Sequence, residues 1–167
     1  MKKNAFLASV SESTGIIFRA GFVLIFTVPM VLIYMNSGVN TLGLSSMPVV
    51  MAKWVADNVG HIWPFFAPSI GALGAFIAGS NTVSNLMFSL FQQSVADQLM
   101  ISGAIVVSLQ AVGAASGNMI AIHNVVAASA TVGLMGQEGL ILRKTILPTL
   151  YYVTVVGVLG LLAIYVF

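Results

Sequence analysis

The sequence predicts an all-α membrane protein, a helical bundle that contains a re-entrant helical hairpin and a discontinuous transmembrane helix. Three observations predict this class. Hydrophobic residues make up 59% of the chain and charged residues only 6%, whereas a soluble domain carries about 25% charged residues. Residues 98–137 contain no Asp, Glu, Lys or Arg, over about twice the length of a spanning helix. Two polar, glycine-containing clusters, at 79–82 and 113–118, interrupt otherwise apolar segments.

The first elements follow from apolar runs and their boundaries. Residues 16–35 predict the first span, with Arg19 near its start and Pro29 as a kink. Residues 36–46 are polar and contain glycine, which indicates a loop. In residues 48–63 the apolar side chains recur at helical spacing, so we expect an amphipathic helix at the interface or packed on the bundle.

Residues 65–92 are too few for two full spans and carry helix-breaking residues in the middle. A spanning helix needs about 20 residues. Gly disfavours the helix interior, and Ser and Asn favour its caps. We therefore expect one half-helix to about Ala78, a turn at 79–81 and a second half-helix that returns by Gln92. Gly71, Ala75 and Gly79 then form a face of small residues that permits close backbone packing.

Residues 99–135 form a longer apolar segment that is also interrupted by a polar, glycine-containing cluster. The cluster GAASGN at 113–118 predicts either a tight turn between two spans or one span that is unwound there. Residues 137–144 are expected to form a loop, and residues 145–167 the last span, with Pro148 in its first turn.

Basic residues precede the first and last spans and are expected in the cytoplasm. They are Lys2, Lys3, Arg19, Arg143 and Lys144. An even number of crossings must then lie between residues 16 and 143. Two topologies satisfy this parity: the non-crossing hairpin with one broken span, and a four-crossing alternative in which 65–92 crosses once and 99–135 twice.

The polar clusters predict a binding site at membrane depth. Irregular backbone is tolerated there only when it is buried in protein or lines a cavity. Ser80, Asn81 and Thr82 open the second half-helix, and Ser116 to Asn118 are expected to open the other. Helix N-termini attract anions, so the clusters indicate a pocket for a small anion, although cross-helix packing by polar side chains is the alternative. His123 is a candidate proton relay within an otherwise uncharged region.

Three stretches carry a family resemblance. They are GALGAFIAGSNTVSNLMF, QAVGAASGNMIAIHNVVAASATVGLMG and EGLILRKTILP. They resemble the C-terminal part of the lactate permease family, bacterial carriers that import lactate and often glycolate with protons. The resemblance extends to the ion-transporter superfamily of carboxylate carriers, which implies that the chain, residues 1–167, is one half of an inverted-repeat transporter in the bacterial plasma membrane. Family members are several-fold longer, so we expect a gene fragment or truncated product, with a missing N-terminal repeat or a second copy as partner.

The resemblance matches Ser80, Asn81 and Thr82 to the motif that binds the substrate carboxylate or a coupling cation, and it puts the unwound span at 113–118. Helix capping would also explain Ser116 and Asn118, and Asn85 either extends the pocket or bonds to a neighbour. The expected substrate-binding residues are Gly79, Ser80, Asn81, Thr82, Asn85, Ser116, Gly117 and Asn118. The implied partners are lactate or glycolate, a coupling proton and the lipid bilayer, with no cofactor, metal or nucleic acid. No hydrolase or nucleotide-binding motif is present in the sequence, so an enzyme is not expected. The alternatives are a channel or structural membrane subunit, which would lack polarity focused at two breaks, and a Na⁺-coupled carboxylate carrier.

Overall fold

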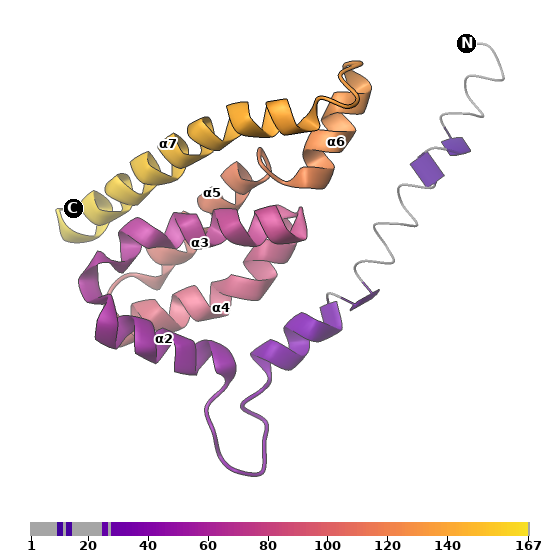
Figure 1. The fold of residues 1–167 in the computed structure, drawn as a ribbon. Helices are drawn as coiled ribbons and strands as arrows, with labels where there is room; N and C mark the ends of the chain where they lie inside the picture. The colour runs from indigo at the N-terminus through magenta and orange to yellow at the C-terminus, as the bar shows by residue number, and fades with distance from the viewer. Residues whose placement is uncertain (1–9, 12, 15–24, 27, 167) are drawn as a thin grey trace.

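The computed structural model describes residues 10–11, 13–14, 25–26 and 28–166 (Figure 1). The regular structure of these residues is helical, which confirms the all-α class. After a helical stretch at 28–35, the elements are α2 (Met47–Asn58), the 3-10 helix η1 (Gly60–Ile62), α3 (Trp63–Ala78), α4 (Asn81–Leu99), α5 (Gly103–Gly117), α6 (Ile122–Thr131) and α7 (Glu138–Tyr165). Most of the predicted first span, 16–35, lies outside the described residues.

Among the described residues, two helical segments are long and apolar enough to cross a membrane. They are Gly60–Ala78, which joins η1 and α3, and α7. α5 and α6 make a third when they are counted together, although the pair is bent by 45° at the break between them. The structure therefore agrees with a membrane protein that contains a broken helix.

The predicted amphipathic helix is present as α2. Pro48 lies at its start, where a missing backbone N–H costs nothing, and Pro48, Ala52 and Val55 form its buried side. The helix ends at Asn58 rather than near 63. Gly60, with φ of 60°, turns the chain there into η1 and α3.

The predicted turn in the 65–92 segment is also present. α3 ends at Ala78, and Gly79 adopts the left-handed conformation with φ of 63°. Ser80 is extended and caps α4, because its Oγ accepts a hydrogen bond from the backbone N–H of Val83 at 3.3 Å. α3 and α4 then run antiparallel (Figure 1). This arrangement excludes one continuous helix through 65–92.

α4 continues past its predicted end at Gln92 to Leu99. Its second half has a buried side that packs in the core with α2, α3 and α5. The Trp63 and Phe91 rings meet edge to face there, with centroids 5.5 Å apart. Tertiary packing therefore sustains a helix whose polar composition alone would not predict it.

The break in the 99–135 segment lies later than predicted. α5 stays helical through Gly113 and Gly117, and the interruption falls at 118–121. The reason is packing. A Cβ on Gly113 would collide with the Pro68 carbonyl, and a Cβ on Gly117 with the Ala72 carbonyl. These glycines let the α3 and α5 backbones touch, as Gly71 does from the α3 side against Gln110, and they do not break the helix.

α7 begins at Glu138, about two turns before the predicted start at 145, so the expected 137–144 loop is helical from 138 onward. Pro148 is consequently in the helix interior and not in its first turn. α7 runs antiparallel to α3. Gly157 packs on the Phe65 carbonyl, and the Tyr165 hydroxyl donates to the His61 carbonyl oxygen at 2.8 Å.

Candidate functional site at the hairpin tip

The α3–α4 turn, which we call the hairpin tip (residues 79–82), meets the α5–α6 break. The Asn124 side-chain amide joins them: its Nδ2 lies 3.5 Å from the Gly79 carbonyl oxygen and 3.3 Å from Asn118 Oδ1. The His123 ring lies directly over Gly79, so that a Cβ on Gly79 would coincide with Nε2 of the imidazole. A glycine is therefore required at 79 both by its left-handed backbone and by this contact.

The hairpin tip carries the N-terminus of α4. The first backbone N–H groups of a helix have no partner within it, and they give this end a partial positive charge. Asn85, one turn further on, donates from Nδ2 to Asn81 Oδ1 at 3.0 Å. Within the described part of the chain Asn85 Oδ1 is buried and has no hydrogen-bond partner. Thr82 is exposed. The tip thus offers amide groups and helix N–H donors.

The structure brings together only some of the predicted site residues. Asn118 caps the end of α5 and reaches Asn124, and His123 lies at the tip. Ser116 and Gly117 close α5 instead of opening the next helix, which corrects the predicted geometry. The Ser116 hydroxyl is buried and donates to the Gly113 carbonyl oxygen at 2.7 Å. α6 begins after Ala121, whose side chain provides no cap.

Sequence reasoning did not single out Asn124, Gln92 or Gln110. Asn124 connects the two breaks, and the two glutamines are completely buried between α3, α4 and α5. Uncharged amides within apolar stretches were the available signal, because a buried amide needs partners and therefore indicates a specific contact.

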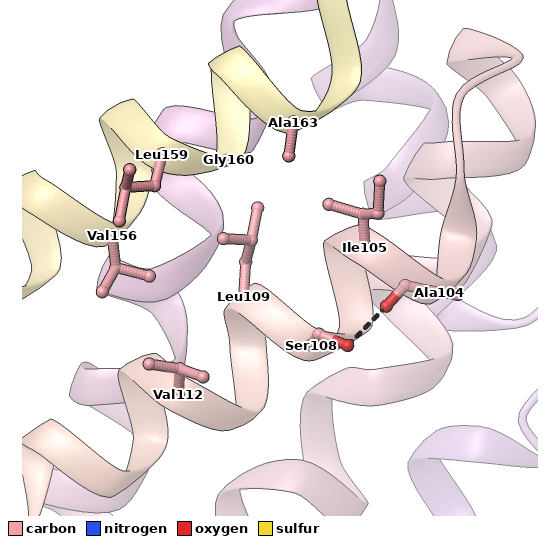
Figure 2. A pocket seen from close by; sticks show the side chains of 9 residues that line it. All are labelled: Ala104, Ile105, Ser108, Leu109, Val112, Val156, Leu159, Gly160 and Ala163. Carbon is pink, nitrogen blue, oxygen red and sulfur yellow. Dashed lines mark hydrogen bonds between the residues drawn. The ribbon is translucent and has the colours of Figure 1, made fainter. Parts of the chain in front are cut away.

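A cavity of about 340 Å³ between α5 and α7 lies elsewhere and differs in character (Figure 2). Its lining is apolar apart from Ser108, whose hydroxyl donates to the Ala104 carbonyl oxygen at 2.7 Å. No lining group is suited to a carboxylate. In the described residues no group of three His, Asp or Glu side chains gathers to hold a metal ion.

Comparison with known proteins agrees with the resemblance seen in the sequence. The chain is 43% identical over 120 residues to a putative L-lactate permease of Haemophilus influenzae, covering 72% of this chain and 22% of that protein. It is 35% identical over 123 residues to the glycolate permease GlcA of Escherichia coli (74% and 22% covered) and 37% identical over 109 residues to the L-lactate permease of Escherichia coli (65% and 20% covered).

The matched segment thus spans about a fifth of the length of these relatives. No solved structure matches the chain. The family described as L-lactate permease matches residues 1–167, and the chain belongs to that family.

Proposed function

We propose that this chain is part of a secondary active transporter that imports L-lactate and related short monocarboxylates, such as glycolate, with protons across the bacterial plasma membrane. The relatives are named as permeases for L-lactate and glycolate, so they are transport proteins and not enzymes. The substrates in these names share a carboxylate and a 2-hydroxyl group. The apolar helices of the chain fit a membrane carrier.

The meeting of the hairpin tip with the α5–α6 break is the observation that carries the proposal. Both are interruptions of helices in a chain built for lipid, and Asn124 holds them together. In this proposal the substrate carboxylate binds at the N-terminus of α4, where the backbone N–H groups of Asn81 and Thr82 point toward it. The amides of Asn81 and Asn85 lie on the same side of α4 and contribute neutral hydrogen-bonding groups.

His123 is the proposed proton carrier. Its ring covers Gly79, so this titratable side chain lies directly at the tip although it is distant in the sequence. A neutral imidazole that gains a proton next to a bound carboxylate would balance the substrate charge, which supports symport. The hairpin is proposed to be re-entrant, and the second half of the pocket to come from an inverted repeat or from a second copy of the chain.

The test of this site is substitution at the tip in a complete permease that contains this segment. Asn81→Ala and Ser80→Ala should each lower the affinity for lactate in uptake by roughly 5- to 150-fold. The reason is that an unsatisfied polar group in a dry pocket costs about 1–3 kcal/mol. Leu86→Ala is the matched control, because Leu86 is an exposed apolar residue one turn further along the same helix.

Initial lactate uptake, normalised to the amount of protein in the membrane, is measured over a range of lactate concentrations with and without an imposed pH gradient. If Asn81→Ala keeps the wild-type affinity and only lowers abundance, Asn81 packs helices together and the site assignment is wrong. If lactate uptake does not depend on the pH gradient but depends on a Na⁺ gradient, the coupling ion is Na⁺ and not the proton.

A further inference from the structure

A chain of hydrogen bonds runs through the dry interior below the hairpin tip. Trp63 Nε1 donates to Gln92 Oε1 at 2.8 Å, and Gln92 Nε2 donates to Gln110 Oε1 at 3.0 Å. Gln110 Nε2 donates to Ser84 Oγ at 3.2 Å, and that hydroxyl donates to the Gly71 carbonyl oxygen at 2.8 Å. We call the side chains of Trp63, Gln92, Gln110 and Ser84 the amide relay. Each of them donates to the next acceptor in this series of hydrogen bonds.

The amide relay is costly unless it is complete. Gln92, Gln110 and Ser84 are wholly buried. A buried amide loses its hydrogen bonds to water, and this costs free energy unless protein partners replace them. In a low dielectric, connected hydrogen bonds also strengthen one another. These directional hydrogen bonds fix the positions of α3, α4 and α5 relative to one another along their axes. Apolar contacts alone would let the helices slide.

Sliding is the relevant freedom because α3 and α5 run in the same direction and touch through their backbones. Pro68 packs on Gly113 and Ala72 on Gly117, and the same sequence offset then pairs Gly79 with Asn124 at the tip. The glycine contacts set how closely the two helices approach, but they provide no side-chain hydrogen bond that would prevent one helix from sliding along the other. The bonds of the amide relay, which end one helical turn from Ser80, supply that axial restraint.

We propose that Gln92 and Gln110 are positioning residues, which set the axial register of α5 against the α3–α4 hairpin and so hold the α5–α6 break against the hairpin tip. A slip by one turn is about 5.4 Å, which no hydrogen bond between Asn124 and Gly79 survives. The hydrogen bonds of the glutamines go to Trp63, Ala67, Ser84 and each other, and so to residues outside the tip. The consequence for transport rests on the proposed function; the positioning itself does not.

The test is a crosslinking measurement in membranes that contain the 167-residue chain, which has no native Cys. Ser80→Cys with His123→Cys reports the distance between tip and break, through its initial rate of reaction with a short bifunctional thiol reagent. His61→Cys with Tyr165→Cys is the control pair, because these residues touch at the other end of the bundle. Each pair is measured with Gln110 intact, with Gln110→Leu and with Gln110→Glu.

Gln110→Leu should slow crosslinking of the tip pair at least about fivefold and leave the control pair unchanged, since it removes the links from α5 to both Gln92 and Ser84. Gln92 Nε2 then keeps only the Ala67 carbonyl oxygen at 3.4 Å, and the Ser84 hydroxyl only the Gly71 carbonyl oxygen. Gln110→Glu restores the relay only when its carboxyl is protonated, because the O–H then replaces the lost N–H donor. Its tip crosslinking should therefore approach the wild-type rate at low pH and fall as the pH rises, measured against the pH dependence of the pair with Gln110 intact.

An unchanged tip pair in Gln110→Leu overturns the proposal, and so does an equal loss in both pairs, which would make the relay a general stabiliser. If Gln110→Leu does not fold, the pH series of Gln110→Glu decides by the same criterion. The proposed function fails separately: in a complete permease, wild-type lactate affinity despite a lost tip crosslink would leave positioning intact and remove the substrate from the tip.

Discussion

Single residues at the hairpin tip show that a glycine can be required for two separate reasons. Gly79 has φ of 63°, which ordinary L residues avoid, and it also receives the His123 ring. Gly133 has φ of 71°, but no atom lies within 4 Å of the position that its Cβ would take, so only the first reason applies to it. The sequence indicated a turn at 79–81, but no local pattern could show which side chain from another helix would cover it.

Gly79→Ala should therefore destabilise the protein more than Gly133→Ala. Both substitutions cost about 1–2 kcal/mol for a left-handed alanine, and only the first displaces the imidazole. The free energy of unfolding in detergent is compared for the two variants and for Gly79→Ala/His123→Ala. Removing the ring should bring the double variant back toward Gly133→Ala. Equal effects of the two single substitutions would mean that His123 does not press on Gly79.

At the scale of elements, the sequence predicted which helices exist better than where they end. The hairpin turn was predicted correctly because Gly-Ser-Asn combines a left-handed residue with a helix cap, and both are local effects. The break at 113–118 was placed too early because the same residue type, glycine, also serves helix packing. Whether Gly113 breaks a helix or contacts Pro68 depends on α3, which lies far away in sequence.

Substitution of α5 glycines separates these two roles. If Gly113 made no packing contact within α5, Gly113→Ala would stabilise the chain by about 0.5–1 kcal/mol through helix propensity. Because a Cβ there meets the Pro68 carbonyl, we expect a loss of about 1–3 kcal/mol instead. Gly139→Ala is the control within a helix, since nothing lies within 4 Å of its Cβ position, and it should be neutral or mildly stabilising. Thermal unfolding in detergent measures both; a gain for Gly113→Ala would contradict the packing role.

At the scale of the whole molecule, the helices have two distinct ends. His61, the α4–α5 turn around Met100 and Tyr165 at the end of α7 line one cavity of about 520 Å³ and so share one end. The hairpin tip, α6 and the start of α7 lie toward the other end (Figure 1). From the charge bias we expect Arg143 and Lys144 in the cytoplasm, and on that expectation the first of these ends lies outside. The sequence alone could not choose between its two topologies, because parity is satisfied by both. The turn between α3 and α4 shows only that the 65–92 segment is not one continuous helix.

This arrangement predicts which positions react from which side of the membrane in intact bacterial cells. Gln98→Cys and His61→Cys should both react with an impermeant thiol reagent added outside, because both side chains are exposed at the same end of the bundle. Gly136→Cys, just before α7, should react only after the cells are opened, and it controls for leakage. The absence of native Cys removes background labelling.

Reaction of Gln98→Cys only from the cytoplasm, with His61→Cys outside, would mean that the 65–92 segment crosses once, and the antiparallel α3–α4 hairpin would then be wrong. Reversal of all three positions would leave the hairpin intact and instead refute the orientation assigned from Arg143 and Lys144.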